Sequence, residues 1–132
     1  MTREGVTYQL HHVGIPTDQV RDGERYAERV GMWTTDDFSG SIPVQWHRFS
    51  DDSPLHILMR TTPHVAYRVN DLALAVVDHK VILGPYEPID GYKVAVIDNA
   101  GMPVEFIETH LTDAEIWGRA QSGTQSALYA KD

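Results

Sequence analysis

The chain has 132 residues, 42% of them hydrophobic and 23% charged, which is typical of one globular domain with a buried core. The 19 acidic and 11 basic residues give a formal net charge of −8, and no basic stripe locally reverses this sign, so we expect no binding to nucleic acid. The lack of cysteine excludes disulfides and thiolate chemistry, and the lack of a long apolar run or a signal-like start predicts a cytoplasmic protein that does not contact membranes.

The first half of the chain predicts a strand, a helix and three further strands. Residues 10–15 alternate in polarity and are rich in β-formers, so they predict a strand. Asp18 is a candidate N-cap for a helix over about 19–30, which Gly31 would end. Strands follow over about 33–38, 43–49 and 55–60, and the polar residues 50–54 form the turn between the last two.

The second half repeats this order. A strand over 64–69 precedes a helix over about 71–80 that Asn70 and Asp71 cap. Further strands are predicted near 81–87, 92–97 and 103–108, with a hairpin turn at 98–101. His12-Val-Gly-Ile and His64-Val-Ala-Tyr lie about 52 residues apart, so the chain contains an internal repeat. We therefore predict one domain of two pseudo-symmetric modules, at about 8–60 and 62–109.

The C-terminal tail, about 112–132, is predicted to be separate from the two modules. Thr112 and Glu115 have the spacing of a capping box, which predicts a short helix over 113–121. The small and polar residues 122–126 then predict a loose end.

Three histidines and one glutamate fall on strand faces that the predicted core does not need. Side chains alternate between the two faces of a strand, and the faces opposite the apolar sets carry His12, His56, His64 and Glu105. Imidazole and carboxylate groups are suitable ligands for zinc, nickel, cobalt, manganese or iron(II). The competing interpretation of each histidine is a surface or hydrogen-bonded core residue, whereas an unpaired carboxylate inside an apolar strand costs free energy. These four residues are therefore candidate ligands for one divalent ion of undetermined identity.

Four phrases of the sequence resemble the vicinal oxygen chelate (VOC) superfamily, which includes glyoxalase I, methylmalonyl-CoA epimerase, extradiol dioxygenases and antibiotic-resistance proteins. They are His12-Val-Gly-Ile, Glu28-Arg-Val-Gly-Met32, His64-Val-Ala-Tyr-Arg-Val-Asn-Asp71 and Asp98-Asn-Ala-Gly-Met-Pro-Val-Glu105. The resemblance covers roughly residues 8–109. It implies a glyoxalase-like α+β fold, in which paired βαβββ modules form a cup-shaped mixed sheet.

The resemblance also implies one divalent metal ion, held by the first and last strand of each module. His12 and His64 match the opening ligands of the two modules, and Glu105 matches the last ligand. His56 falls where family members place Glu, Gln or His, and glyoxalase I has a glutamate there. Only 7 residues separate His56 from His64, so the modules pair either within one chain or across a homodimer with shared sites.

The implied function is a metal-dependent lyase, isomerase or epimerase that acts through an enolate-type intermediate on a small oxygenated carbonyl or hydroxy-acid compound. Glu105 is the candidate proton carrier. Arg60 and Arg68 are candidates for binding a substrate anion, and Trp46 and Tyr92 for lining the cavity. Solvated strand ends and core aromatics are the competing interpretations of these four residues.

Two other functions fit the same residues. An iron(II) extradiol-type dioxygenase needs two histidines and one carboxylate with open coordination positions, and a fourth ligand at His56 would crowd such a site. A ligand-sequestering protein of the antibiotic-resistance type usually lacks the metal ligands, so four retained positions argue against it. The sequence has no Gly-x-Ser-x-Gly, Gly-x-Gly-x-x-Gly or phosphate-loop motif, which argues against that hydrolase class and against nucleotide binding.

Overall fold

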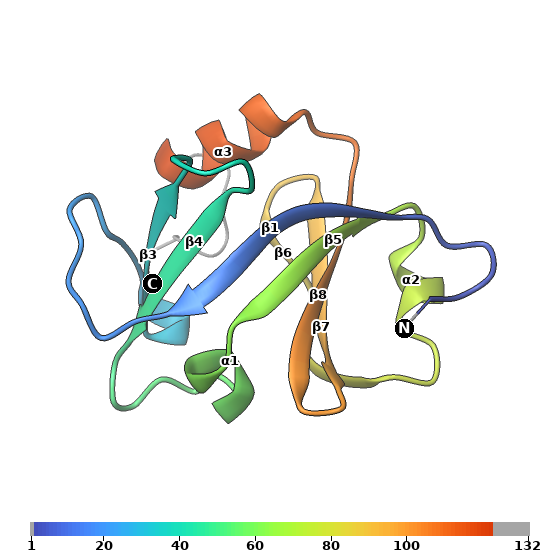
Figure 1. Ribbon diagram of the computed structural model, residues 1–132, viewed down its shortest axis with the longest axis horizontal. Coiled ribbons are helices and arrows are strands. Elements are labelled where there is room, and N and C mark those ends of the chain that lie inside the picture. The colour runs from blue at the N-terminus through green and yellow to red at the C-terminus, as the bar shows by residue number, and fades with distance from the viewer. Residues whose placement is uncertain (1, 123–132) are drawn as a thin grey trace.

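The computed structural model describes residues 2–122, and its central feature is one mixed sheet of eight strands (Figure 1). The strands are β1 (Tyr8–Pro16), β2 (Arg25–Ala27), β3 (Met32–Asp37), β4 (Val44–Phe49), β5 (His64–Val69), β6 (Lys80–Ile89), β7 (Tyr92–Asn99) and β8 (Met102–Thr109). The helices are the 3-10 helix η1 (Glu28–Val30), α1 (Ile57–Thr61), α2 (Leu72–Ala75) and α3 (Asp113–Ser122). Within residues 2–122, no helix is long and apolar enough to cross a membrane.

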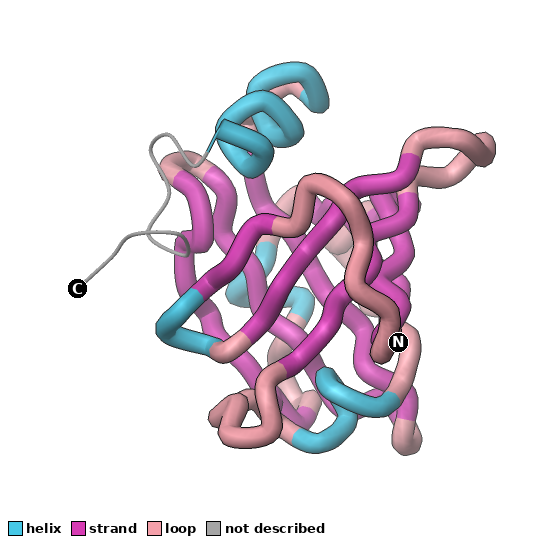
Figure 2. The backbone as a smooth tube through the Cα atoms, turned by 90° about the vertical axis from the view of Figure 1, so that its left-hand side faces the viewer, coloured by secondary structure: helices cyan, strands magenta, loops and turns pink. Residues whose placement is uncertain are grey.

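The sheet consists of two halves that are related by a pseudo-two-fold axis between β1 and β5. The strand order is β2-β3-β4-β1-β5-β8-β7-β6. At the centre β1 and β5 run antiparallel, with Gly14 opposite His64 and His12 opposite Ala66. Each of these strands also pairs in parallel with the last strand of its own half, β1 with β4 and β5 with β8. The sheet curls around its concave face (Figure 2), which confirms the predicted cup-shaped mixed sheet.

The outer face of the second half packs under α2, as the alternating pattern predicts. Leu72 and Ala75 of α2 join Val69, Val104 and Phe106 in one buried apolar cluster. Asp71 begins the helix, since its carboxylate accepts a hydrogen bond from the Leu74 amide at 3.0 Å. Full burial of a side chain such as Phe106 contributes about 2–3 kcal/mol, so this cluster fixes which face of β5 and β8 points into the cup.

The predicted helix over about 19–30 is wrong. Residues 17–24 form a loop, in which Gly23 has a φ of +79° and interrupts any helix at a cost of about 1 kcal/mol. The chain then forms β2 against β3, where Tyr26 and Trp33 pack with ring centroids 4.4 Å apart. Cross-strand contacts of this kind outweigh the local helical spacing, and only the three residues of η1 are helical before the left-handed residue Gly31.

The predicted strand over 55–60 is also wrong, because this segment contains α1. The side chain of His56 caps the helix, with its Nδ1 accepting a hydrogen bond from the Leu58 amide at 3.1 Å. Leu55 and Met59 are both buried in one cluster inside the cup, whereas Ile57, which a strand would place on the same face as these two residues, is 52% exposed.

The predicted tail helix is confirmed as α3. Its capping box is present, since the Glu115 amide donates to Thr112 Oγ1 at 3.2 Å and the Thr112 amide donates to the Glu115 carboxylate at 3.1 Å. In Figure 1, α3 lies across one end of the cup and α1 at the other end. The predicted loose end falls mostly outside the described residues.

Candidate metal centre

His12, His64 and Glu105 meet on the concave side of the sheet. They come from three adjacent strands, β1, β5 and β8, and their ligand atoms all lie within 4.8 Å of one another. His12 is 2% exposed and His64 4%. The structure therefore brings together residues of both modules within one chain.

Two buried polar atoms in this cluster have no hydrogen-bond partner. His12 Nε2 and Glu105 Oε2 lie 3.2 Å apart, but neither makes a hydrogen bond of acceptable geometry. Unsatisfied buried polar atoms are rare in proteins, and each one calls for an explanation such as an ion. Two imidazoles and a carboxylate that converge in this way fit a divalent transition metal or zinc.

The charge state of the cluster favours a bound cation. Burial raises the pKa of Glu105, but the polar contacts of its carboxylate with the imidazoles of His12, His64 and His47 outweigh burial and lower the pKa below its usual 4.5. Burial also lowers the pKa of His64. At neutral pH the site therefore holds an ionised carboxylate next to the neutral ring of His64, which are the forms that bind metal.

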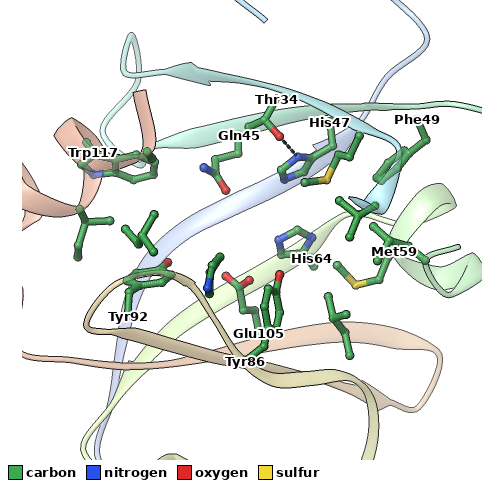
Figure 3. A pocket seen from close by; sticks show the side chains of 18 residues that line it. Thr34, Gln45, His47, Phe49, Met59, His64, Tyr86, Tyr92, Glu105 and Trp117 are labelled. Carbon is green, nitrogen blue, oxygen red and sulfur yellow. Dashed lines mark hydrogen bonds between the residues drawn. The ribbon is translucent and has the colours of Figure 1, made fainter. Parts of the chain in front are cut away.

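Gln45 occupies the position in the first half that Glu105 occupies in the second half. On β4, Gln45 is paired with Gly14 of β1, and on β8, Glu105 is paired with Ala66 of β5. The pseudo-two-fold axis relates these two pairs, because Gly14 faces His64 exactly as Ala66 faces His12 in the central ladder. Figure 3 shows Gln45 and Glu105 extending into the same cavity from opposite walls.

The Gln45 side chain is held in place by its neighbour on β3. Its Nε2 donates a hydrogen bond to Asp36 Oδ1 at 3.2 Å, and Arg25 donates to the same oxygen at 3.1 Å. With the amide nitrogen engaged, the amide oxygen is the atom left to face a cation. The sequence pattern does not distinguish Gln45, because its place opposite Gly14 follows only from the strand register.

His56 lies outside the cluster of His12, His64 and Glu105. Its Nδ1 is used to cap α1, and His56 does not line the cavity described below. The prediction that His56 is the fourth ligand rests on a strand over 55–60, and the structure replaces that strand with a helix.

His47 is a further buried histidine beside the cluster. Its Nδ1 is hydrogen-bonded to Thr34 Oγ1 at 2.9 Å, and its ring stacks on that of His64 with centroids 5.7 Å apart. Burial, followed by the charges of His64 and His12, lowers the pKa of His47 to about 3. The ring is therefore neutral at pH 7 and forms part of the cavity wall without adding charge.

The cluster opens into a cavity of about 90 Å³ between α1 and α3. One end is polar, with Gln45, His47, His64 and Glu105 (Figure 3). The rest is lined by apolar and aromatic side chains, among them Met32, Phe49, Leu55, Met59, Leu83, Tyr86, Tyr92, Ile116 and Trp117. Within residues 2–122, no lysine or arginine lines this cavity.

Of the four predicted substrate-binding residues, Tyr92 alone lines the cavity. Arg60 donates to the Leu55 carbonyl at 3.0 Å, and Arg68 donates to the carbonyls of Thr109 and Leu111. Both arginines thus stabilise chain segments near the cup. The Trp46 indole donates to Asp37, and its ring lies under Arg21 with the guanidinium 4.8 Å from the ring centroid. Trp46 points away from the cavity because it alternates with Gln45 and His47 on β4.

No protein-family model and no curated protein matches the sequence, but solved structures do match the fold. A hypothetical protein from Bacillus halodurans is similar with a TM-score of 0.61 and 19% identity, over 80% of this chain and 97% of that one. Methylmalonyl-CoA epimerase from Mycobacterium tuberculosis is similar with a TM-score of 0.55 and 17% identity, over 77% of this chain and 88% of that one. The chain therefore has a glyoxalase-like fold, as the resemblance implied.

Proposed function

We propose that this chain binds one divalent metal ion through His12, Gln45, His64 and Glu105 and catalyses proton transfer on a small oxygenated carbonyl or hydroxy-acid compound, as a lyase, isomerase or epimerase. The observation that carries the proposal is the pair of buried atoms without hydrogen bonds, His12 Nε2 and Glu105 Oε2, within a three-residue ligand cluster. Gln45 replaces His56 as the proposed fourth ligand because the register gives it the position related to Glu105.

The cavity supports a compact substrate with an apolar portion. Its volume of about 90 Å³ leaves room for a small molecule, and its polar atoms are gathered at the end where the proposed ligands converge. A substrate with two neighbouring oxygens and a short carbon skeleton would place the oxygens at this end and the skeleton against Met32, Phe49 and Met59. The similarity to methylmalonyl-CoA epimerase in fold agrees with proton transfer as the reaction class.

The residues of the site have distinct proposed roles. An ion held by His12, Gln45, His64 and Glu105 would supply Lewis-acid stabilisation of negative charge on a substrate oxygen. Glu105 is ionised at neutral pH, and an ionised carboxylate is the form that can accept a proton from the substrate. Burial raises the pKa of Tyr92 well above 10, so its phenol stays neutral at the cavity wall and can donate a hydrogen bond. The apolar wall excludes water from the proton-transfer path.

The first test is the metal content of the purified protein, measured by mass spectrometry, together with its affinity for zinc, nickel, cobalt, manganese and iron(II). We expect about one ion per chain in the wild type, and a loss of binding in His12→Ala and Glu105→Gln. His110→Ala removes an exposed histidine and serves as the matched control, which should bind as the wild type does. A wild-type protein that takes up none of these ions refutes the proposal.

The second test is exchange of substrate carbon-bound hydrogen with solvent deuterium, followed by NMR on a panel of short 2-hydroxy and 2-keto acids. We expect exchange that requires metal and is lost in Glu105→Gln. Oxygen consumption with catechols in the presence of iron(II), without such exchange, would instead favour the dioxygenase, which His12, His64 and Glu105 also fit. Tight binding of ligands to metal-free protein would favour sequestration. A homodimer, predicted from the sequence, is to be measured separately by light scattering.

A further inference from the structure

His11, which the proposed function does not use, lies directly behind the ligand His12. The pairing register of β1 with β5 shifts between Leu10 and His12, so His11 sits at a bulge. The bulge allows two consecutive side chains to approach each other, and the two Nδ1 atoms are 2.8 Å apart. The His11 side chain is only 6% exposed, so this contact is sheltered from water.

The contacts of His11 determine which nitrogen of each ring carries a hydrogen. His11 Nε2 lies 3.2 Å from Asp113 Oδ1, and a carboxylate can only accept, so this nitrogen carries the hydrogen of the neutral His11 ring. The Nδ1 atom of His11 then carries no hydrogen, and it accepts a hydrogen bond from the N–H group at His12 Nδ1. His12 Nε2 is consequently left with a free lone pair, which agrees with its contact to Glu105 Oε2: the two atoms lie 3.2 Å apart but lack the geometry of a hydrogen bond, unlike His11 Nε2 and Asp113. A histidine that binds a metal ion through Nε2 needs this same tautomer, with its hydrogen on Nδ1.

The helix α3 contacts His11 at two points one helical turn apart. Asp113, its first residue, forms the polar contact with His11 Nε2. Trp117 stacks on the His11 ring, with centroids 5.6 Å apart and planes 10° apart, and it packs edge-to-face with the His12 ring, with centroids 5.8 Å apart. Trp117 also lines the cavity. Asp113 is 69% exposed, so water competes for its hydrogen bond with His11, and the stacked indole contributes most of the fixed geometry.

We propose that His11 is a positioning residue that holds His12 in its metal-binding tautomer, and that through His11 the docking of α3 is coupled to metal binding at the centre. The coupling is reciprocal: docked α3 raises the affinity for metal, and bound metal stabilises docked α3 by the same factor. Only the coupling of α3 to metal binding rests on the proposed function. The tautomer of His12 does not, because it is a property of the metal-free protein.

The first experiment measures the histidine tautomers by long-range nitrogen–proton NMR on metal-free protein. We expect His12 with its hydrogen on Nδ1 in the wild type, and a mixture of tautomers in His11→Ala. His11→Asn offers an amide oxygen close to the position of the lost Nδ1, so it should restore the wild-type tautomer in part. A His12 ring with its hydrogen on Nε2 in the wild type, or a tautomer unchanged in His11→Ala, overturns the proposal.

The second experiment compares zinc affinity by competition with a chelator, and backbone amide hydrogen exchange of residues 113–122 with and without zinc. We expect His11→Ala to weaken zinc binding about 10–100-fold, as changes behind a metal ligand do, with His11→Asn between it and the wild type. Zinc should slow exchange in α3 of the wild type and much less in His11→Ala, while His110→Ala behaves as wild type. Unchanged zinc affinity in folded His11→Ala overturns the coupling. Failure of the wild type to bind zinc or any other divalent ion refutes the proposed function and leaves the tautomer result to stand separately.

Discussion

Replacing Gly14 by alanine should remove metal binding while leaving the fold intact. Gly14 faces His64 across the central ladder, and a Cβ atom at this position would lie 2.1 Å from His64 Cε1 and 2.4 Å from Nε2. Non-bonded carbon atoms pack at about 3.5–4.0 Å. The imidazole would therefore have to withdraw by roughly 1.5 Å, which is the shortfall from normal contact.

A displacement of this size is small for the core and large for a metal ligand. The ring is the end of a side chain that can rotate, so we expect a stability cost of about 1–3 kcal/mol, as in other overpacked sites. Metal–ligand distances, in contrast, hold to within about 0.2 Å, so His64 would no longer bind. Loss of one ligand should lower the affinity for zinc at least ~100-fold, beyond the effect of changes behind a ligand.

The assay is chelator competition for zinc, with urea unfolding of the metal-free protein in parallel. Gly40→Ala is the matched control, because a Cβ there meets only the Ile42 carbonyl at 3.9 Å. The expected result is a large loss of affinity with a modest loss of stability in Gly14→Ala, and neither in Gly40→Ala. Wild-type zinc affinity in Gly14→Ala would refute the reasoning, because it would mean that the His64 ring is not held at this position as a ligand.

Changes at three further residues test separate parts of the structure. Gln45→Ala should weaken zinc binding about 10–100-fold, whereas Gln45→Glu should retain it, and competition titrations that leave Gln45→Ala unaffected would remove this residue from the centre. His56→Ala should cost about 1 kcal/mol in urea unfolding, through loss of the α1 cap, with unchanged metal content. Glu24→Gln should be less stable than the wild type at pH 7, because the hydrogen bond from Arg48 lowers the pKa of Glu24. A lowered carboxyl pKa stabilises the fold above the unfolded value of about 4.5, and this contribution is lost as the pH falls through the lower folded value, so the difference between the two unfolding curves should shrink toward pH 3.

The strands that the sequence predicts well are those whose two faces meet different surroundings. In β5 and β8 one face packs under α2 and the other faces the cavity, so polarity alternates and the positions of His64 and Glu105 follow from counting residues. The helix caps are equally predictable, because the side chains of Asp71 and Thr112 accept hydrogen bonds from backbone amides in the first turn of their own helices. These features depend only on residues that are close together in the sequence, so they can be predicted without knowledge of the fold.

The errors in the first half have one physical origin, which is that β2 forms only by pairing with β3. Its three residues carry no strand pattern of their own, and the contacts that fix it, such as that of Tyr26 with Trp33, join positions the sequence does not mark as neighbours. Without β2, the count of strands in the first half shifts by one. The sequence pattern then places the last strand of the module at 55–60 instead of at β4, and this is why it predicts His56 rather than Gln45 as the fourth ligand.

The identity of Gln45 matters for the chemistry, because it sets the charge of the proposed centre. The four side chains carry one negative charge in total, that of Glu105, since His12, His64 and Gln45 are neutral as ligands. A divalent ion held by this set keeps a net charge of +1, and in a cavity without lysine or arginine among the described lining residues that charge is the main attraction for a substrate anion. Gln45→Glu would cancel it, so this variant should bind metal well and still bind an anionic substrate poorly. The same chain with a second carboxylate at position 45 should favour a neutral substrate, so the neutral side chain of Gln45 supports the proposal that the substrate is an anionic oxygen compound.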